Sequence, residues 1–517
     1  MKERSSAKTV RTIGLMAVII FCAKLLGLLR EVLIASVYGQ GYSSDILNTS
    51  TQIPLLFFDM TLGVAILSTF VPIFNNCLEN NGREKALRFA DNFLTVTVTL
   101  ATMLAALGMI FAKQIVGLMV PGYDAEKIAE TARLLRVLFP SIIFTTAAYT
   151  SVGLLQSFGE FNIPSLISVV SNLIMILYLL IVGNRFGLVG VIVSMVVAWA
   201  SQIFVQLPHL RKFGYKYRFA FNLMDKNLVS AARLAVPVLV SSWVQPLCVV
   251  INMAFGSALG DGAVSGLNWA NKIYIIMVGI FAYAVTNFIF PRLSRLSAGD
   301  DSAEFSQTTR QSVAWVAVII AYVSAMFIAL SKPIIQVVFE RGEFTPDDTA
   351  LTANALLFYS VGMVGYAICE ILNKSFYAVQ DGKTPMLTSI TGVIVNFASA
   401  FVFVRLFEMG VGGLALASAV SSIFMAVVLI GMMNKKKSGT FGGGFVVNIL
   451  KVLVCGAVSA VVARSIYMAV DGLGQGMAWA FLKLVLSAVP GLLAYLIVLV
   501  ILKTDEIKQI RSLTHEK

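Results

Sequence analysis

Charged residues are scarce in this chain. Asp, Glu, Lys and Arg fill 13% of its 517 positions, whereas hydrophobic residues fill 58% and the mean hydropathy is +0.85. A soluble domain carries roughly a quarter charged residues, so this composition excludes an ordinary soluble protein. Apolar runs of about twenty residues, long enough to cross a hydrocarbon core of about 30 Å, recur from end to end. The chain is therefore predicted to work within a membrane.

Histidine and cysteine are also sparse. The two histidines, His209 and His515, lie in basic segments, and the five cysteines are scattered without the spacing of a metal or redox site. These residues cannot form a zinc site or a histidine-based catalytic triad. No glycine-rich phosphate loop is present either, so direct use of ATP is not expected. We predict a transporter rather than an enzyme, without a cofactor or metal, driven by the membrane potential or by the gradient of an ion that the sequence does not identify.

The net charge of +12 comes mainly from basic residues in alternate loops. Such clustering follows the positive-inside rule for cytoplasmic segments, so no nucleic-acid partner is expected. The first apolar run resembles a signal peptide, but it contains Lys24 and Arg30 and lacks a small-residue cleavage site. We therefore predict a retained first helix and an inner-membrane, multi-pass protein with both termini in the cytoplasm.

The apolar segments predict an all-α integral membrane protein of about fourteen transmembrane helices. An even number places all the basic loops on one side of the membrane. The predicted helices lie near residues 11–38, 46–76, 86–113, 129–157, 164–184, 187–208, 228–257, 264–291, 308–331, 346–378, 385–405, 411–433, 445–470 and 476–502.

The first twelve predicted helices contain a weak internal repeat. Thr131 precedes Pro164 by the same interval as Thr352 precedes Pro385, and an acidic residue stands four positions before each proline. A repeat of six helices predicts two pseudo-symmetric lobes with a substrate site at their interface, plus two C-terminal helices outside the repeat. The predicted domains are residues 1–215 and 216–437 for the lobes, and 438–517 for the terminal helix pair and cytoplasmic tail.

Charges inside the first predicted span are the strongest functional signal, because each costs at least about 2.5–3.5 kcal/mol near the bilayer centre. Lys24, Gly27 and Glu31 share one face of a regular helix, whereas Arg30 points elsewhere unless the helix bends near Gly27. One interpretation is an internal Lys24–Glu31 or Arg30–Glu31 ion pair that offsets its own desolvation. The other is a cationic wall that faces a water-filled cavity and binds an anion such as a diphosphate.

Three further charges lie in or beside predicted spans. Lys272 stands in the first third of the eighth span, where it either binds substrate or extends its ammonium group to the membrane surface. Asp45 opens the second span and either stabilises the helix start or takes part in gating. Asp59 lies deeper in that span, and we interpret it as a partner for a cavity cation or as a proton-coupling group.

Several of these segments resemble the MurJ (MviN) family of lipid II flippases, within the multidrug/oligosaccharidyl-lipid/polysaccharide exporter superfamily. The resemblance covers nearly the whole chain. Its strongest parts are GLLRE at 27–31 with Asp45, WANK at 269–272, FPRLSR at 290–295, FERGEFT at 339–345 and SFYAVQDGKTP at 375–385.

The resemblance implies a flippase that moves lipid II, an undecaprenyl-diphosphate-linked disaccharide-pentapeptide, to the outer leaflet for peptidoglycan synthesis. It implies alternating access around a cationic central cavity, with cell-wall synthesis proteins as candidate partners. Arg30, Glu31 and Asp45 match functional positions of the family. Lys24 and Lys272 stand where better-known members have arginine, so they keep the charge but lose the bidentate fork.

Two other functions stay open on the sequence. A flippase for another polyprenyl-linked glycan would use the same cations, whereas a drug/cation antiporter of the same superfamily would be poorly served by them. A membrane enzyme would need a carboxylate constellation in a sizeable outer loop, and the longest outer loops here are short leads into helices.

Overall fold

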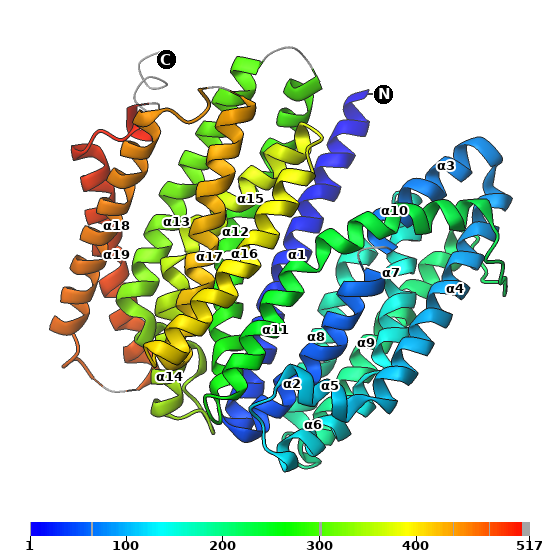
Figure 1. Ribbon diagram of the computed structural model, residues 1–517, viewed down its shortest axis with the longest axis horizontal. Coiled ribbons are helices and arrows are strands. Elements are labelled where there is room, and N and C mark those ends of the chain that lie inside the picture. The colour runs from blue at the N-terminus through cyan, green and yellow to red at the C-terminus, as the bar shows by residue number, and fades with distance from the viewer. Residues whose placement is uncertain (1, 64–65, 299–301, 438, 475, 509–517) are drawn as a thin grey trace. The chain divides into compact units, whose positions relative to one another are not determined.

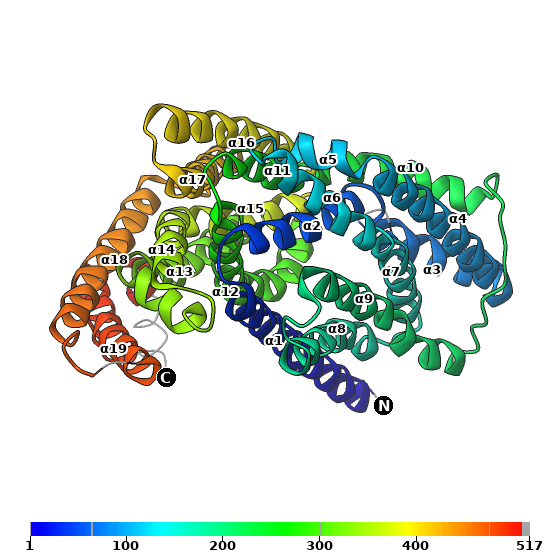
Figure 2. The same cartoon turned by 90° about the horizontal axis from the view of Figure 1, so that it is seen from below.

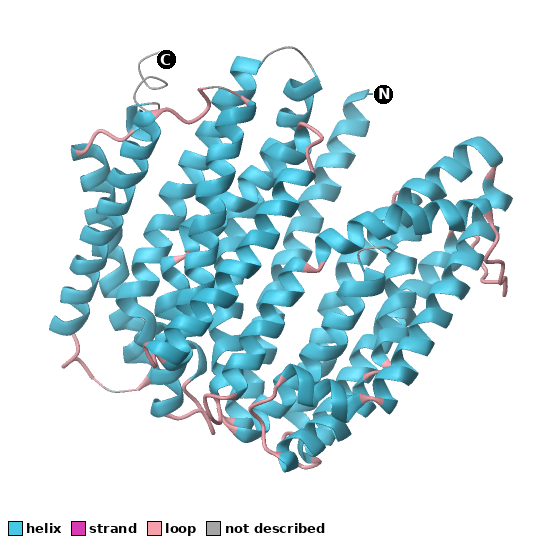
Figure 3. Ribbon diagram, viewed as in Figure 1, coloured by secondary structure: helices cyan, strands magenta, loops and turns pink. Residues whose placement is uncertain are grey.

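The computed structural model describes residues 2–63, 66–298, 302–437, 439–474 and 476–508. Helices account for nearly all of this part of the chain, and it contains no strand (Figure 3). The prediction of an all-α protein is therefore confirmed.

The chain divides into two compact units. The first comprises residues 1–264 together with 341–344, and the second comprises 265–340 and 345–517. The three-part division at residues 215 and 437 rests on the internal repeat rather than on compactness, and it stays a prediction.

The first unit contains eleven α-helices and two short π-helical segments within its described residues (Figures 1 and 2). They are α1 (Lys2–Tyr38), α2 (Tyr42–Phe58), η1 (Asp59–Gly63), η2 (Ile66–Phe70), α3 (Val71–Asn81), α4 (Arg83–Ile110), α5 (Ala112–Met119), α6 (Ala125–Leu138), α7 (Ser141–Ser157), α8 (Asn162–Ile181), α9 (Gly187–Lys212), α10 (Lys226–Ser242) and α11 (Val244–Ser257).

The second unit includes α12 except for its first two residues. Its described part also contains seven further α-helices and one π-helical segment. They are α12 (Ala263–Ala298), α13 (Ser302–Phe339), α14 (Pro346–Val361), α15 (Met363–Ala378), α16 (Lys383–Phe401), η3 (Val402–Leu406), α17 (Gly410–Lys436), α18 (Gly443–Ala469) and α19 (Met477–Ile501).

Eleven helical segments of the described chain are long and apolar enough to cross a membrane, and the bent pair α14–α15 makes twelve. The two other predicted spans correspond to α1 and to α10–α11. The count of fourteen is therefore not confirmed, although the protein is a multi-pass membrane protein. The bend of 49° between α14 and α15 falls at Gly362, where a Cβ would lie 2.4 Å from the Cα of Ala419 on α17. A glycine at this position allows the two backbones to approach closely.

Packing in the first unit places α1, which carries Lys24, Arg30 and Glu31, against α8. α1 contacts α8, and α8 contacts α9, so α1 lies along one side of this unit (Figure 2). Deeper in the unit, Phe70 contacts the rings of Phe74, Phe89 and Phe93 at centroid distances of 4.9–5.8 Å. These buried rings fix α3 and α4 against the π-helical segment η2 by close packing.

Candidate functional site

Arg30 is held by two side chains, one from its own helix and one from α8. Its Nη2 donates to Glu31 Oε1 at 2.6 Å, and its Nη1 donates to Asn172 Oδ1 at 3.0 Å. The Asn172 amide nitrogen in turn donates to the carbonyl of Ala23 at 3.3 Å. Arg30 keeps 27% of its side chain exposed, whereas Glu31 keeps 8%. The guanidinium is therefore oriented but not sealed from its surroundings.

A hollow of about 530 Å³ lies beside α1. Among the residues that the structure describes, Lys24 is the one charged residue that lines it, and Asn172 joins this hollow to the Arg30 pair. Because Glu31 offsets the charge of Arg30, Lys24 supplies the surplus positive charge. The lining residues are Met16, Ile20, Ala23, Lys24, Tyr149, Val152, Gln156, Pro164, Ser165, Ile167, Ser168 and Asn172.

This arrangement suits an anionic group with an apolar attachment. Lysine and arginine donate charge-assisted hydrogen bonds to phosphate oxygens, and the surrounding aliphatic wall limits competition from water. The sequence named Lys24, Arg30 and Glu31 as candidate binding residues. The structure joins Arg30 to Glu31 and Asn172, and Lys24 lines the same hollow as Asn172, so a common binding role stays a prediction. The internal ion pair also exists, so the Arg30–Glu31 contact by itself does not separate the two interpretations.

Asp45 belongs to a second charged cluster in the first unit. Its Oδ2 accepts from Lys127 Nζ at 3.0 Å and from the backbone N–H of Gly262 at 2.9 Å. Lys127 Nζ also donates to Asp261 Oδ1 at 2.6 Å and lies 4.2 Å from the centre of the Tyr123 ring. The side chains of Lys127 and Asp45 are 3% and 0% exposed. This cluster joins α2, α6 and the loop before α12.

Asp59 and Lys272 belong to elements other than those that form these two clusters. Asp59 begins the π-helical segment η1, is half-buried, and forms no ion pair with any residue that the structure describes. Lys272 is half-buried on α12 in the second unit, between the buried Trp269 and Tyr274. A common site for Lys272 and the cations of α1 therefore stays a prediction.

Asn172, Lys127 and Asp261 belong to these clusters but were not predicted from the sequence. Asn172 is a lone amide in an apolar run, and its position opposite Arg30 depends on how α1 packs on α8. Lys127 stands near a predicted outer loop, but so do Lys113, Arg185 and Arg341, so its charge alone did not single it out. Within the described ranges, no three His, Cys, Asp or Glu residues could hold a metal ion together.

Comparison with known proteins decides the family. The family model described as Lipid II flippase MurJ matches residues 34–482. The chain belongs to this family. Its fold and its class as a transporter, not an enzyme, follow from that membership, and both predictions are confirmed.

Curated relatives support the same conclusion. A protein of Bdellovibrio bacteriovorus, named a probable lipid II flippase MurJ, is 24% identical over 98% of this chain and 97% of its own length. The probable lipid II flippase MurJ of Vibrio cholerae is 27% identical over 79% of each chain.

Solved structures show the shared fold. A lipid II flippase MurJ in an inward closed conformation matches 95% of this chain and 99% of its own, with a TM-score of 0.77 and 21% identity. An inward-facing multidrug resistance transporter of the MATE family and MOP superfamily matches 81% of this chain and 95% of its own, with a TM-score of 0.65 and 14% identity. The resemblance to the wider superfamily is thereby confirmed at the level of the fold.

Proposed function

We propose that this protein moves lipid II from the inner to the outer leaflet of the cytoplasmic membrane for peptidoglycan synthesis. The observation that carries the proposal is the cationic patch of α1, where Lys24 faces a hollow and Arg30 is held in place by Glu31 and Asn172. Family membership supplies the substrate class, and the patch supplies a binding mode for its diphosphate.

The proposed cycle is alternating access around a cationic cavity. Lys24 and Arg30 would bind the diphosphate, and Lys272 would contribute a further cation from the second unit. The three-part division into two six-helix lobes and a terminal pair belongs to the same proposal, as do the cytoplasmic position of both termini and contact with cell-wall synthesis proteins. Several cations suit a diphosphate better than a carboxylate because a diphosphate carries more negative charge and more acceptor oxygens.

Asp45 and Asp59 have different proposed roles. Asp45 would act in gating. Its contacts with Lys127 and the Gly262 backbone join α2, α6 and the loop before α12, and these segments can separate only if the contacts break. Asp59 would couple transport to an ion, because a half-buried carboxylate within a span is costly unless it is used.

The decisive experiment measures outer-leaflet exposure of lipid II in cells depleted of this protein, using a probe that cannot cross the membrane. We expect exposure to fall and inner-leaflet lipid II to accumulate. Wild-type protein should restore exposure, and Arg30→Ala should not, although it reaches normal abundance. Arg88→Ala is the matched control, because Arg88 forms a similar 2.7 Å pair with Glu84 at the exposed start of α4.

Two results would count against the proposal. Unchanged exposure in a strain without a second flippase would point to another polyprenyl-linked glycan or to a drug as the cargo. Disappearance of Arg30→Ala from the membrane would instead favour the internal ion pair as the role of Arg30.

A further inference from the structure

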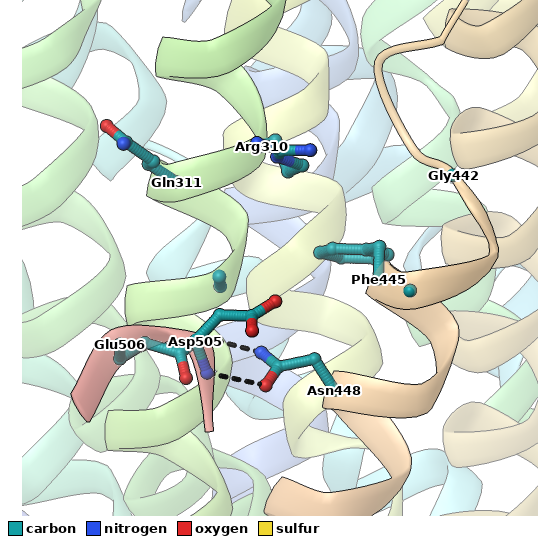
Figure 4. A pocket seen from close by; sticks show the side chains of 9 residues that line it. Arg310, Gln311, Gly442, Phe445, Asn448, Asp505 and Glu506 are labelled. Atoms are coloured by element: carbon teal, nitrogen blue, oxygen red, sulfur yellow. Dashed lines mark hydrogen bonds between the residues drawn. The ribbon is translucent and has the colours of Figure 1, made fainter. Parts of the chain in front are cut away.

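A polar pocket of about 240 Å³ lies in the second unit, away from the residues assigned to transport. It is formed by the early part of α13, the start of α18 and the segment that follows α19 (Figure 4). This end of the unit also carries the basic run Lys435–Lys437 at the C-terminal end of α17, so the charge pattern predicts that it faces the cytoplasm. Its lining residues are Arg310, Gln311, Ala314, Gly442, Gly444, Phe445, Asn448, Asp505 and Glu506.

The floor of the pocket contains an incompletely satisfied carboxylate. Glu506 is 2% exposed, and its Oε1 accepts from Asn448 Nδ2 at 2.8 Å. The same asparagine accepts from the backbone N–H of Asp505 at 3.0 Å, as Figure 4 shows. The other oxygen, Oε2, has no hydrogen-bond partner within the described chain. A buried carboxylate oxygen without a partner is costly, so this oxygen calls for a donor from a ligand.

The opposite side of the pocket is built for an anion. α18 begins at Gly443, and no side chain caps its first N–H groups. At Gly442 and Gly444, an added Cβ would meet nothing within 4 Å, so a ligand can approach the backbone there. Arg310 is exposed beside them and forms no ion pair within the described residues. A helix N-terminus with an arginine binds phosphate favourably.

One pocket thus offers a phosphate subsite and a subsite for a group that donates N–H bonds to a carboxylate. We infer that it binds the phosphoethanolamine headgroup of a membrane phospholipid. The phosphate would contact Arg310 and the start of α18, and the ammonium would donate to Glu506 Oε2. Phosphatidylglycerol lacks the ammonium, and a choline headgroup has no N–H to donate.

The surface next to the pocket favours a lipid over a soluble zwitterion. Val446, Val447 and Leu450 follow the first turn of α18 and are 52–56% exposed. On a membrane-spanning helix these side chains face acyl chains. A lipid whose headgroup occupies the pocket would therefore bury its chains against the same helix.

Lipid binding to the purified full-length protein tests this inference. Native mass spectrometry with equal amounts of phosphatidylethanolamine, phosphatidylcholine and phosphatidylglycerol of identical acyl chains reports the preference directly. We expect phosphatidylethanolamine to bind about tenfold better than phosphatidylcholine, the gain of one charge-assisted hydrogen bond. Glu506→Gln should reduce that preference to about twofold. Arg310→Gln should weaken binding of all three lipids, and its exposed position leaves the fold intact.

Asp471→Asn is the matched control, because it removes a carboxylate at the other end of the α18–α19 pair and should leave the preference unchanged. Equal binding of phosphatidylethanolamine and phosphatidylcholine by the wild type would overturn the inference. So would a preference for phosphatidylglycerol, or a phosphatidylethanolamine preference that survives both pocket variants. Soluble glycerophosphoethanolamine is expected to bind far more weakly than the lipid, and equal binding would assign the pocket to a soluble zwitterion instead.

Discussion

The first unit contains two clusters of charge that differ in how completely they are neutralised. Around Lys127, two carboxylates and a backbone N–H form a network in which Lys127 and Asp45 are 3% and 0% exposed, whereas Asp261 is 61% exposed. The Lys127–Asp45 pair within it is sealed. Around Arg30, one carboxylate and one amide orient a guanidinium that stays 27% exposed, and Lys24 adds a charge beside a hollow. Burial of charge alone therefore does not mark a binding site, whereas surplus charge next to an open volume does.

The difference predicts separate consequences of mutation. A sealed pair acts mainly on stability, because removing one partner leaves an uncompensated buried charge. An oriented and accessible cation acts mainly on binding, because its remaining hydrogen-bonding capacity is available to a ligand.

The largest expected effect on stability is that of Lys127→Met. Asp45 would be left buried without its cation, and we expect a loss of about 3–5 kcal/mol of folding free energy. Thermal unfolding with a thiol-reactive dye measures it, since Cys77, Cys369 and Cys455 are buried in the native protein. Adding Asp45→Asn should recover part of the loss. The control Lys508→Met removes an exposed ion pair with Asp505. If Lys127→Met lost as little stability as this control, the buried Lys127–Asp45 pair would not be a stabilising element.

Lys272 is a half-buried cation of the second unit. If this half-buried lysine binds the diphosphate, Lys272→Ala should lower lipid II transport at least tenfold at unchanged abundance, whereas Lys272→Arg should be tolerated. Transport is measured by outer-leaflet exposure in a strain that depends on the variant. Normal growth of a strain relying solely on Lys272→Ala would remove Lys272 from the site.

A smaller effect is expected for Asn172→Ala. The substitution removes one hydrogen bond to Arg30 but leaves the Glu31 pair, so Arg30 keeps its charge and loses part of its orientation. We expect transport to fall about five- to tenfold, in line with a net contribution of about 1 kcal/mol from one hydrogen bond. A fall in protein abundance without a change in transport per molecule would show that Asn172 acts only in packing α1 on α8.

The smallest effect concerns an ion pair outside the spans. Partial burial acts to raise the pKa of Asp381, but hydrogen bonds from Lys436 and Thr384 outweigh it and lower that pKa to about 2. A lowered pKa stabilises the fold above the unfolded value of about 4, and this contribution is lost as the pH falls toward 2.

Lys436→Gln should therefore flatten the decline in stability between pH 4 and pH 2 while costing no more than about 1 kcal/mol at pH 7. Thermal unfolding across this range measures both quantities. An unchanged acid profile would show that the Thr384 hydrogen bonds alone hold the carboxylate.

Several residues of the candidate site could be predicted because a charged residue inside an apolar run can be recognised from the sequence alone. Lys24, Arg30 and Glu31 were named from the sequence as candidate binding residues, and in the structure Arg30 pairs with Glu31 and Asn172 while Lys24 lines the hollow beside Asn172. The partners could not be predicted, since Asn172 stands 142 positions from Arg30, and Lys127 stands 82 positions from Asp45. Such pairs depend on which helices pack together and on the rotation of each helix about its axis.

The sequence by itself determined that this is an all-helical, multi-pass membrane protein, because hydrophobicity and the cost of charge in a bilayer are properties of each segment alone. Its family motifs determined the expected cargo. Only the tertiary structure decided which charges are sealed and which stay available, and it alone revealed the pocket at Glu506. Neutralisation is a relation between distant residues, so it becomes visible only when the helices are packed.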